Sequence, residues 1–334
     1  MFKQIQPIFP VEILEFIIQE VPLEECSPIL LTNRSLGFIA LRVLYRTIPE
    51  LSPRRTIKCL KTLATNQENA ALVRKLSIDW THHRVLGNLF RLLRHALEQL
   101  TSLHTLSVEL SPDDNHFNLA WIFPERTFSL RTLSTSVRCD APLARFLETQ
   151  PRISELSLRG FQTSQPFNLN PSALPMLTSF RVVHAGTPVL SVVLKDRPIE
   201  GVSLSLFPDD GFLPLDTLRL PSRPIKRLTI MSLDSTPPNV LIPEVSVRLP
   251  RLEALHVVVL MAQYDYPMLQ NSGPLLSHFS ELRYLTFMSA VTATLDDEQE
   301  IAKLWHKACP TLKTIILPRG KVWFEREGKW TCCG

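Results

Sequence analysis

The chain has 334 residues, of which 45% are apolar and 27 are proline, but only 10 are glycine. So few glycines argue against phosphate-binding loops, and neither Gly-x-Gly-x-x-Gly nor Gly-x-x-x-x-Gly-Lys is present. The net charge of +4 is spread without a long run of Lys and Arg, which disfavours nucleic-acid and membrane-surface partners.

Sequence signals for export and membrane insertion are also missing. The longest apolar runs are too short to cross a bilayer. The apolar stretch after Pro10 is interrupted by glutamates and has no small-residue cleavage site, so we expect no signal peptide. The cysteines at 26, 59, 139, 309, 332 and 333 show neither metal-ligand spacing nor the density of a secreted disulfide scaffold. We therefore expect reduced thiols, no cofactor and a cytoplasmic or nuclear location.

Three short helices are predicted near the N-terminus. The stretch 10–21 begins with a proline suited to a first helical turn and places apolar residues at helical spacing. Ser27-Pro28 predicts a capped second helix, and the stretch 36–45 predicts a third. Helices of this length do not cover their own apolar surface. We expect them to pack on a partner protein or on the structure that follows.

Further helices are predicted along the rest of the chain. One begins at Ser52-Pro53, which puts a junction near residues 46–55 without a flexible linker. Others are indicated at 86–100, at 142–149 and after a cap at Thr294. The last of these is expected to bury a stripe formed by Ile301, Leu304, Trp305 and Ala308.

Between the helices one phrase recurs, in which the apolar residues are separated by two variable residues and then by one. Its copies are Val73-Leu76-Ile78, Leu103-Leu106-Val108, Leu130-Leu133-Thr135, Ile153-Leu156-Leu158, Leu177-Phe180-Val182, Ile199-Val202-Leu204, Ile225-Leu228-Ile230, Leu252-Leu255-Val257, Leu282-Leu285-Phe287 and Leu312-Ile315-Leu317. They begin 30, 27, 23, 24, 22, 26, 27, 30 and 30 residues apart, the period of a solenoid with one strand and one return segment per repeat. The predicted fold is α/β, with a three-helix unit at residues 7–48 and an irregular solenoid of about ten strand–helix repeats at residues 53–334.

The N-terminal helices resemble a known motif. The run Phe9-Pro10-Val11-Glu12-Ile13-Leu14-Glu15-Phe16-Ile17-Ile18, then Val21-Pro22-Leu23, Leu30-Leu31-Thr32-Asn33-Arg34-Ser35 and Leu44-Tyr45-Arg46, is similar to an F-box. The resemblance implies docking to the small adaptor subunit of cullin–RING ubiquitin ligases. It places at that interface Phe9, Pro10, Ile13, Leu14 and Ile17, with Leu30, Leu31 and Leu44 in support. The alternative interpretation of these apolar residues is an amphipathic cap on the end of the solenoid.

The strand phrase resembles leucine-rich repeats, and ligase subunits with such repeats often carry an N-terminal F-box. Other residues stand where the repeat expects Asn or Cys: Phe161, Ala185, Phe207 and Leu233. The repeats are therefore degenerate, and we expect irregular turns in place of a ladder of side-chain amides. The segment 301–330 resembles the closing stretch of fungal F-box proteins with degenerate repeats. Trp323, Phe324 and Trp330 are suited to covering the last strand edge.

Catalytic and metal-binding patterns are scarce. No Gly-x-Ser-x-Gly is present, and the neighbouring His82-His83 pair would point to opposite faces of a strand, which suits chelation poorly. Asp113-Asp114 and Asp209-Asp210 lie among Pro, Asn and Gly and are interpreted as solvated turns. We therefore expect no enzymatic activity. The enzymatic alternative is a right-handed parallel β-helix of the kind that cleaves polysaccharides, which would need short strands throughout.

Surface recognition is the function that remains. In a solenoid, residues between the buried strand positions form an open face that binds partners. Small hydroxyls dominate the central position of the phrase, so distinctive contacts to a target are expected from Glu155, Arg159, Arg181, Arg227, His256 and Tyr284. Together with the resemblance, this predicts a substrate-recruiting subunit of a cullin–RING ubiquitin ligase, with the adaptor, the cullin complex and an unidentified target protein as partners. A repeat scaffold without a ligase link is the alternative.

Overall fold

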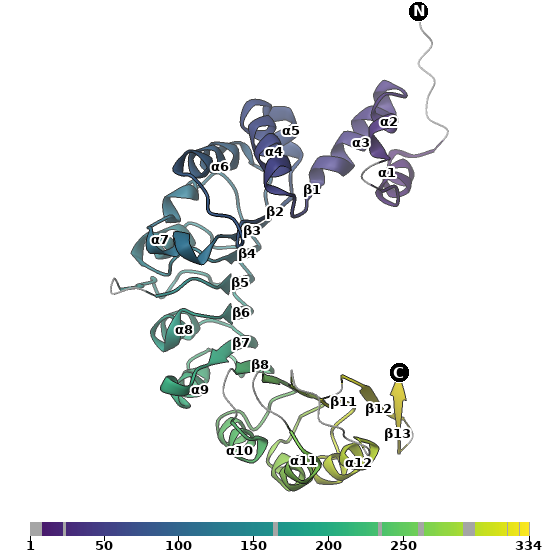
Figure 1. The fold of residues 1–334 in the computed structure, drawn as a ribbon, viewed down its shortest axis with the longest axis vertical. Helices are drawn as coiled ribbons and strands as arrows, with labels where there is room; N and C mark the ends of the chain where they lie inside the picture. Colours follow the sequence, from purple (N-terminus) through teal and green to yellow (C-terminus); the bar gives the residue numbers. More distant parts are fainter. Residues whose placement is uncertain are drawn as a thin grey trace, which may run out of the picture. The chain divides into compact units, whose positions relative to one another are not determined.

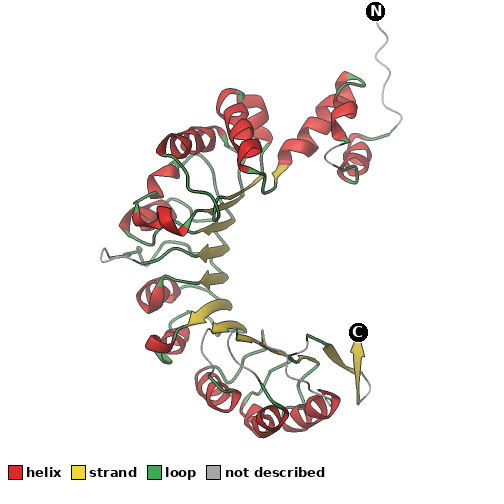
Figure 2. Cartoon of the chain, in the orientation of Figure 1, coloured by secondary structure: helices red, strands yellow, loops and turns green. Residues whose placement is uncertain are grey.

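The computed structural model describes residues 9–22, 25–162, 166–232, 236–259, 264–289, 298–318, 320–326 and 328–333. The chain forms two compact units, Met1–Val137 and Arg138–Gly334. Strands and helices alternate along both units (Figure 1). Within each unit the repeat strands lie on one side and the helices on the other (Figure 2).

The first unit begins with helices and continues as strand–helix repeats. Its helices are α1 (Val11–Gln19), α2 (Cys26–Leu30), α3 (Arg34–Arg46), α4 (Pro53–Thr65), α5 (Gln67–Leu72) and α6 (Gly87–Gln99), with 3-10 turns η1 (Pro112–His116) and η2 (Ala120–Ile122). Its strands are β1 (Thr47–Ile48), β2 (Lys75–Asp79), β3 (Thr105–Glu109) and β4 (Thr132–Thr135). These strands pair in parallel with their neighbours in sequence order.

The junction after the third helix contains no linker. Helix α3 ends at Arg46, strand β1 starts at Thr47, and β1 pairs in parallel with β2. The backbone N–H of Arg74 also donates to the carbonyl of Arg46 at 3.0 Å. The helices α1–α3 are thus joined directly to the repeats of the first unit.

The second unit consists of strand–helix repeats closed by a hairpin. Its strands are β5 (Glu155–Leu158), β6 (Ser179–Val182), β7 (Gly201–Leu206), β8 (Arg227–Ser232), β9 (Ala254–Val259), β10 (Tyr284–Ser289), β11 (Thr314–Ile316), β12 (Val322–Arg326) and β13 (Lys329–Cys333). Its helices are α7 (Ala141–Glu148), α8 (Gly186–Leu194), α9 (Leu213–Asp216), α10 (Pro238–Arg248), α11 (Tyr266–Ser272) and α12 (Glu298–Ala308), with 3-10 turns η3 (Pro208–Asp210), η4 (Thr217–Arg219) and η5 (Gly273–His278). Strands β5 to β11 pair in parallel, whereas β12 and β13 pair antiparallel.

The ten strand phrases predict the strands β2 to β11, and the repeat fold is confirmed to that extent. Equivalent apolar positions lie opposite one another, as in the row Leu228, Leu255 and Leu285. All three side chains are at most 1% exposed, so the repeats stack into a continuous apolar core. Helices between the strands distinguish this architecture from the β-helix kept as an alternative.

The predicted helices are present, but a cap and one buried stripe differ from the prediction. Helix α2 begins at Cys26 after Glu25, so the cap predicted at Ser27 is wrong. In α12, Ile301 and Trp305 are fully buried, but Leu304 is 36% exposed and does not belong to the buried stripe. The cap predicted at Thr294 lies outside the described residues.

The C-terminal edge is covered by a hairpin that the sequence did not predict as strands. Strand β12 pairs with β11, and β13 pairs with β12. Of the three aromatic residues predicted to cover this edge, Trp330 is 4% exposed and packs edge-on against His306, whereas Trp323 and Phe324 are half-buried. The backbone pairing covers the edge of β11, and Trp330 fixes the hairpin to α12.

A buried arginine, Arg197, joins neighbouring repeats of the second unit. Its guanidinium donates to five backbone carbonyls, those of Val192, Ala173, Asn170, Val193 and Lys195, at 2.7, 2.8, 2.9, 3.1 and 3.1 Å. Val192 and Val193 belong to the last turn of α8, whose carbonyls have no partner within the helix. Ala173 and Asn170 lie in the preceding repeat, so one side chain caps a helix and connects two repeats. These hydrogen bonds supply part of the connection between neighbouring repeats that a ladder of side-chain amides would otherwise give.

Candidate functional site

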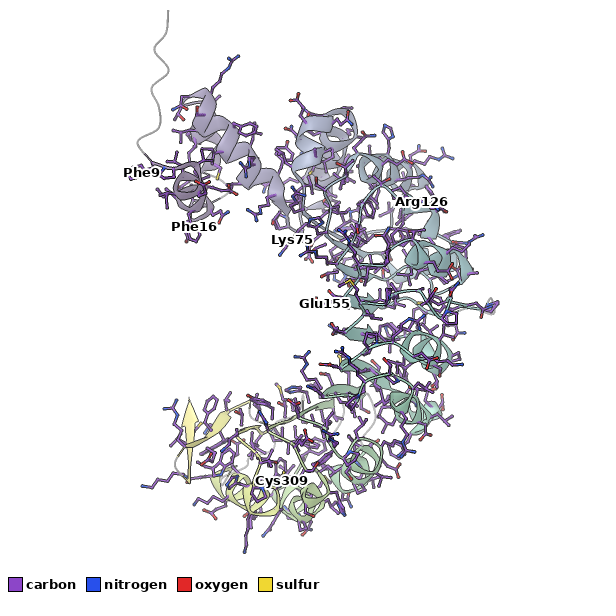
Figure 3. The ribbon with its side chains drawn as sticks, turned by 180° about the vertical axis from the view of Figure 1, so that it is seen from behind. Phe9, Phe16, Lys75, Arg126, Glu155 and Cys309 are labelled. Atoms are coloured by element: carbon purple, nitrogen blue, oxygen red, sulfur yellow. The ribbon has the colours of Figure 1, made fainter. Side chains whose placement is uncertain are left out.

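Helix α1 exposes apolar side chains on one face. Ile13, Phe16 and Ile17, spaced as neighbours on a helix surface, are 47%, 69% and 52% exposed, and we name them the α1 face. Figure 3 labels Phe16 together with Phe9, which precedes the helix and is also exposed. Leu31, directly after α2, and Phe38 on α3 are exposed as well. Apolar surface on or beside each of these helices indicates that α1–α3 leave many of their apolar residues uncovered.

The reason lies in the small core of α1–α3. Only Ile18, Ile39 and Ala40 form a buried cluster among the described residues of these helices, with partly buried residues packed around it. The backbones of α2 and α3 approach closely at Gly37, where an added Cβ would lie 2.8 Å from the carbonyl oxygen of Leu30. That approach leaves little volume for side chains between α2 and α3 at this point, which is consistent with the small size of the buried cluster.

The residues predicted for adaptor binding divide into two groups in the structure. Those with exposed side chains are Phe9, Pro10, Ile13, Ile17 and Leu31. Leu14 and Leu30 are partly buried and pack against the helical core. Pro10 also has a structural role, because its carbonyl accepts the N–H groups of Ile13 and Leu14 at the start of α1.

Phe16 is the member of the α1 face that the sequence interpretation missed. Its position three residues after Ile13 is the signal that could have identified it. Leu44, a residue that the resemblance places in support, is half-buried in the structure.

Electrostatic contacts fix α1 against α3. The carboxylate of Glu15 binds Arg42 at 3.2 Å and Arg46 at 2.9 Å. The Glu15 side chain is only 14% exposed, so water screens these ion pairs less than fully exposed ones. A hollow lined by Phe16, Val43 and other residues of this region opens beside the pair. Glu15 therefore holds the helix that presents the α1 face.

The second unit presents an open row of side chains along its strands. The strand registers place the outward residues in two rows, Glu155, Ser179, Gly201, Arg227, Ala254 and Tyr284 in one, and Ser157, Arg181, Ser203, Thr229, His256 and Thr286 in the other. Figure 3 shows Glu155 on the strand side of this unit, away from the helices. Five of the six residues predicted for target binding lie in these rows, which we name the strand face. The sixth, Arg159, follows β5 directly.

Within the strand face, His256 is the residue with a perturbed proton affinity. Burial lowers the pKa of His256 below its ordinary value of 6.5, so the ring is neutral near pH 7. Its Nδ1 atom lies 2.9 Å from Oγ1 of Thr286 on the neighbouring strand. Tyr284, on the same strand as Thr286, is 48% exposed. These contacts order the side chains of β9 and β10 on the strand face.

Clusters suited to metal binding are not found among the described residues, where no group of three His, Cys, Asp or Glu side chains is close enough to hold an ion. His82 and His83 are exposed in the turn after β2. The prediction of solvated turns is wrong for Asp114, which is 4% exposed, and burial raises the pKa of its carboxyl. Within the described part of the chain, no helix is both long and apolar enough to cross a membrane.

Comparisons with known proteins do not assign this chain to a family. No protein-family model matches this chain, and no curated protein matches it either. Among solved structures, internalin C2 from Listeria monocytogenes strain 4b F2365 is similar, with 12% identity and a TM-score of 0.33 over 78% of this chain and 91% of that one. The evidence for the α/β repeat architecture is therefore the strand registers of this chain.

Proposed function

We propose that this chain is a non-enzymatic repeat scaffold that binds other proteins through the α1 face and the strand face. The observation that carries the proposal is the exposed apolar surface of α1–α3 above a core of three buried residues. Burying an apolar side chain of this size stabilises a complex by roughly 1.5–3 kcal/mol relative to full exposure. Because the three residues of the α1 face are between about half and two-thirds exposed, a partner covering them would gain roughly 2.5–5 kcal/mol.

A more specific candidate is docking of the α1 face to the small adaptor subunit of a cullin–RING ubiquitin ligase. The F-box resemblance places Phe9, Ile13, Ile17 and Leu31 at or beside the adaptor interface, and all four are exposed. An aromatic residue, Phe16, lies among them, and aromatic side chains are frequent anchors of protein interfaces. The direct passage from α3 into β1 would hold a docked adaptor rigidly against the repeats of the first unit.

The test is calorimetric titration of the purified full-length chain with the purified adaptor subunit. The informative variant is Ile13→Asp with Ile17→Asp, because both side chains are exposed and the substitutions leave the helical core intact. Leu14→Asp is unsuitable, since Leu14 packs against that core and its loss would unfold the helices. The matched control is Met176→Asp with Leu213→Asp, two residues of the second unit that are 56% and 64% exposed.

We expect the wild type and the control variant to bind the adaptor equally. The α1-face variant should bind about 100-fold more weakly, since two charges would be buried in an apolar interface. Absence of binding by the folded wild type would remove the ligase role. Equal loss in both variants would show that acidic surface charge alone, not the α1 face, controls binding.

A further inference from the structure

The strand face of the second unit carries two arginines on either side of strand β7. Arg181 lies on β6 and Arg227 on β8, the strands that pair with β7. The β7 residues between them are small, Gly201, Ser203 and Ser205. With no large side chain on β7, the guanidinium groups have room to lie over it.

Both guanidinium groups do reach over β7. The Nη2 atom of Arg181 on β6 is 3.8 Å from Sδ of Met231 on β8, so these two side chains meet over β7, the strand between them. From the other side, Nε and Nη2 of Arg227 lie 3.6 and 3.8 Å from the point where a Cβ on Gly201 would be. Gly201 is buried although its side of the sheet carries no helix, because Arg227 from β8 and Ser179 from β6 lie against it.

Neither arginine is neutralised by a carboxylate among the described residues. By contrast, other cations near these strands are paired, Arg223 with Glu200 at 3.0 Å and Lys226 with Glu253 at 3.6 Å. The outward positions of β6, β7 and β8 hold no acidic residue. The face above β7 therefore keeps two unpaired positive charges, which are complementary to an anionic partner.

Hydroxyl groups complete this surface. Ser203, Ser205 and Thr229 are half-buried between the two arginines, and within the described structure their side chains make no hydrogen bond. Each can donate to a carboxylate oxygen, in addition to the charge-assisted bonds from the guanidinium groups. Two guanidinium groups and several unpaired hydroxyl donors on one exposed surface suit a ligand with several carboxylates.

We propose that the surface formed by Arg181, Arg227 and the hydroxyls around β7 binds an extended acidic segment of a partner protein. The proposal rests on the strand face being a protein-binding surface. Arg227 reaches toward Gly201, and Arg181 reaches toward the level of Ser205, so the two charges lie roughly 7–13 Å apart along β7. Carboxylates on one face of an extended chain are spaced at about 7 or 13 Å when they are two or four residues apart. The segment would therefore carry Asp or Glu at alternate positions.

The experiment measures fluorescence anisotropy of a labelled eight-residue peptide of alternating Glu and Ser, titrated with the full-length chain. The test variant is Arg181→Gln with Arg227→Gln. The control variant is Arg145→Gln with Arg152→Gln, which removes the same charge from exposed positions of the same unit, on α7 and in the turn after it. Circular dichroism and thermal unfolding confirm that each variant is folded.

We expect the wild type and the control variant to bind the acidic peptide within about twofold of each other, and the test variant to bind about tenfold more weakly. A peptide in which Gln replaces Glu should lose the same factor. Equal weakening in both variants, or no binding to the wild type at millimolar peptide, would overturn the proposal.

Two further ligands, together with the Gln peptide, separate the alternatives. Tighter binding of a phosphoserine peptide would assign the surface to phosphate instead of carboxylate, and tighter binding of an oligothymidylate would assign it to nucleic acid. Equal binding of the Gln and Glu peptides would leave the strand face as a protein-binding surface while overturning its acidic specificity. Because the α1-face variant keeps the strand face unchanged, failure of adaptor binding and failure of peptide binding are read independently.

Discussion

Replacing Arg197 with Met tests how the repeats of the second unit are joined. The substitution keeps side-chain length but removes every donor to the five carbonyls. Two of these contacts, to Ala173 and Val193, are fully buried, and an unsatisfied buried carbonyl costs roughly 1–3 kcal/mol. Burial desolvates the guanidinium group and lowers the pKa of Arg197. Removing this buried charge relieves the desolvation penalty and offsets part of that cost. We expect the free energy of unfolding to fall by about 3 kcal/mol.

The assay is urea unfolding followed by circular dichroism, combined with amide exchange of α8 and the segment 166–178. Exchange should accelerate in both places, because one side chain stabilises both. Arg197→Lys keeps the charge but not the fork of donors, so it should fall between the wild type and Arg197→Met. Arg145→Met, at an exposed position on α7, should change stability by less than about 0.5 kcal/mol. A loss below about 1 kcal/mol in Arg197→Met would refute this reasoning.

Three smaller perturbations test other contacts. Glu15→Gln should lower the stability of the α1–α3 helices by about 1 kcal/mol, a modest loss because the partner arginines are partly exposed. The loss should be measured as faster amide exchange in α1. Unchanged exchange would show that the ion pairs do not stabilise these helices. Gly273→Ala should lower the melting temperature although Ala favours helices, because its Cβ would lie 3.1 Å from the ring of Trp305; a higher melting temperature would mean that the ring can shift. Acidification below about pH 6.5 should reduce the free energy of unfolding, because the lowered pKa of His256 makes the folded state bind fewer protons than the unfolded state. The variant His256→Gln should show a flatter dependence of stability on pH. An identical pH profile in the variant and the wild type would contradict this prediction.

The repeat strands could be predicted from the sequence because their signal is local. Two apolar residues at alternate positions, preceded by a third, mark a strand buried on one face. The hairpin strands β12 and β13 lack that phrase, and their pairing follows from contact with β11. Helix α8 was not predicted either, because its run Gly186–Leu194 is rich in β-branched residues and carries no amphipathic pattern.

The candidate sites were predictable only in part, because they depend on contacts between distant residues. The spacing of Ile13 and Ile17 indicated a helical face, but its exposure depends on the packing of α1 in three dimensions, which turns Leu14 and Ile18 toward the helical core instead. The paired arrangement of Arg181 and Arg227 over β7 required the strand register. Arg197 has partners 24 and 27 residues earlier in the chain, and no local pattern identifies it.

The most direct test of the proposed docking role is hydrogen–deuterium exchange of the full-length chain with and without the purified ligase adaptor. Docking at the α1 face predicts slower exchange of the α1 amides and unchanged exchange in β7 to β9. The α1-face variant should show no such protection. Unchanged exchange throughout α1–α3 at saturating adaptor would contradict adaptor docking and leave the chain as a repeat scaffold without a ligase link.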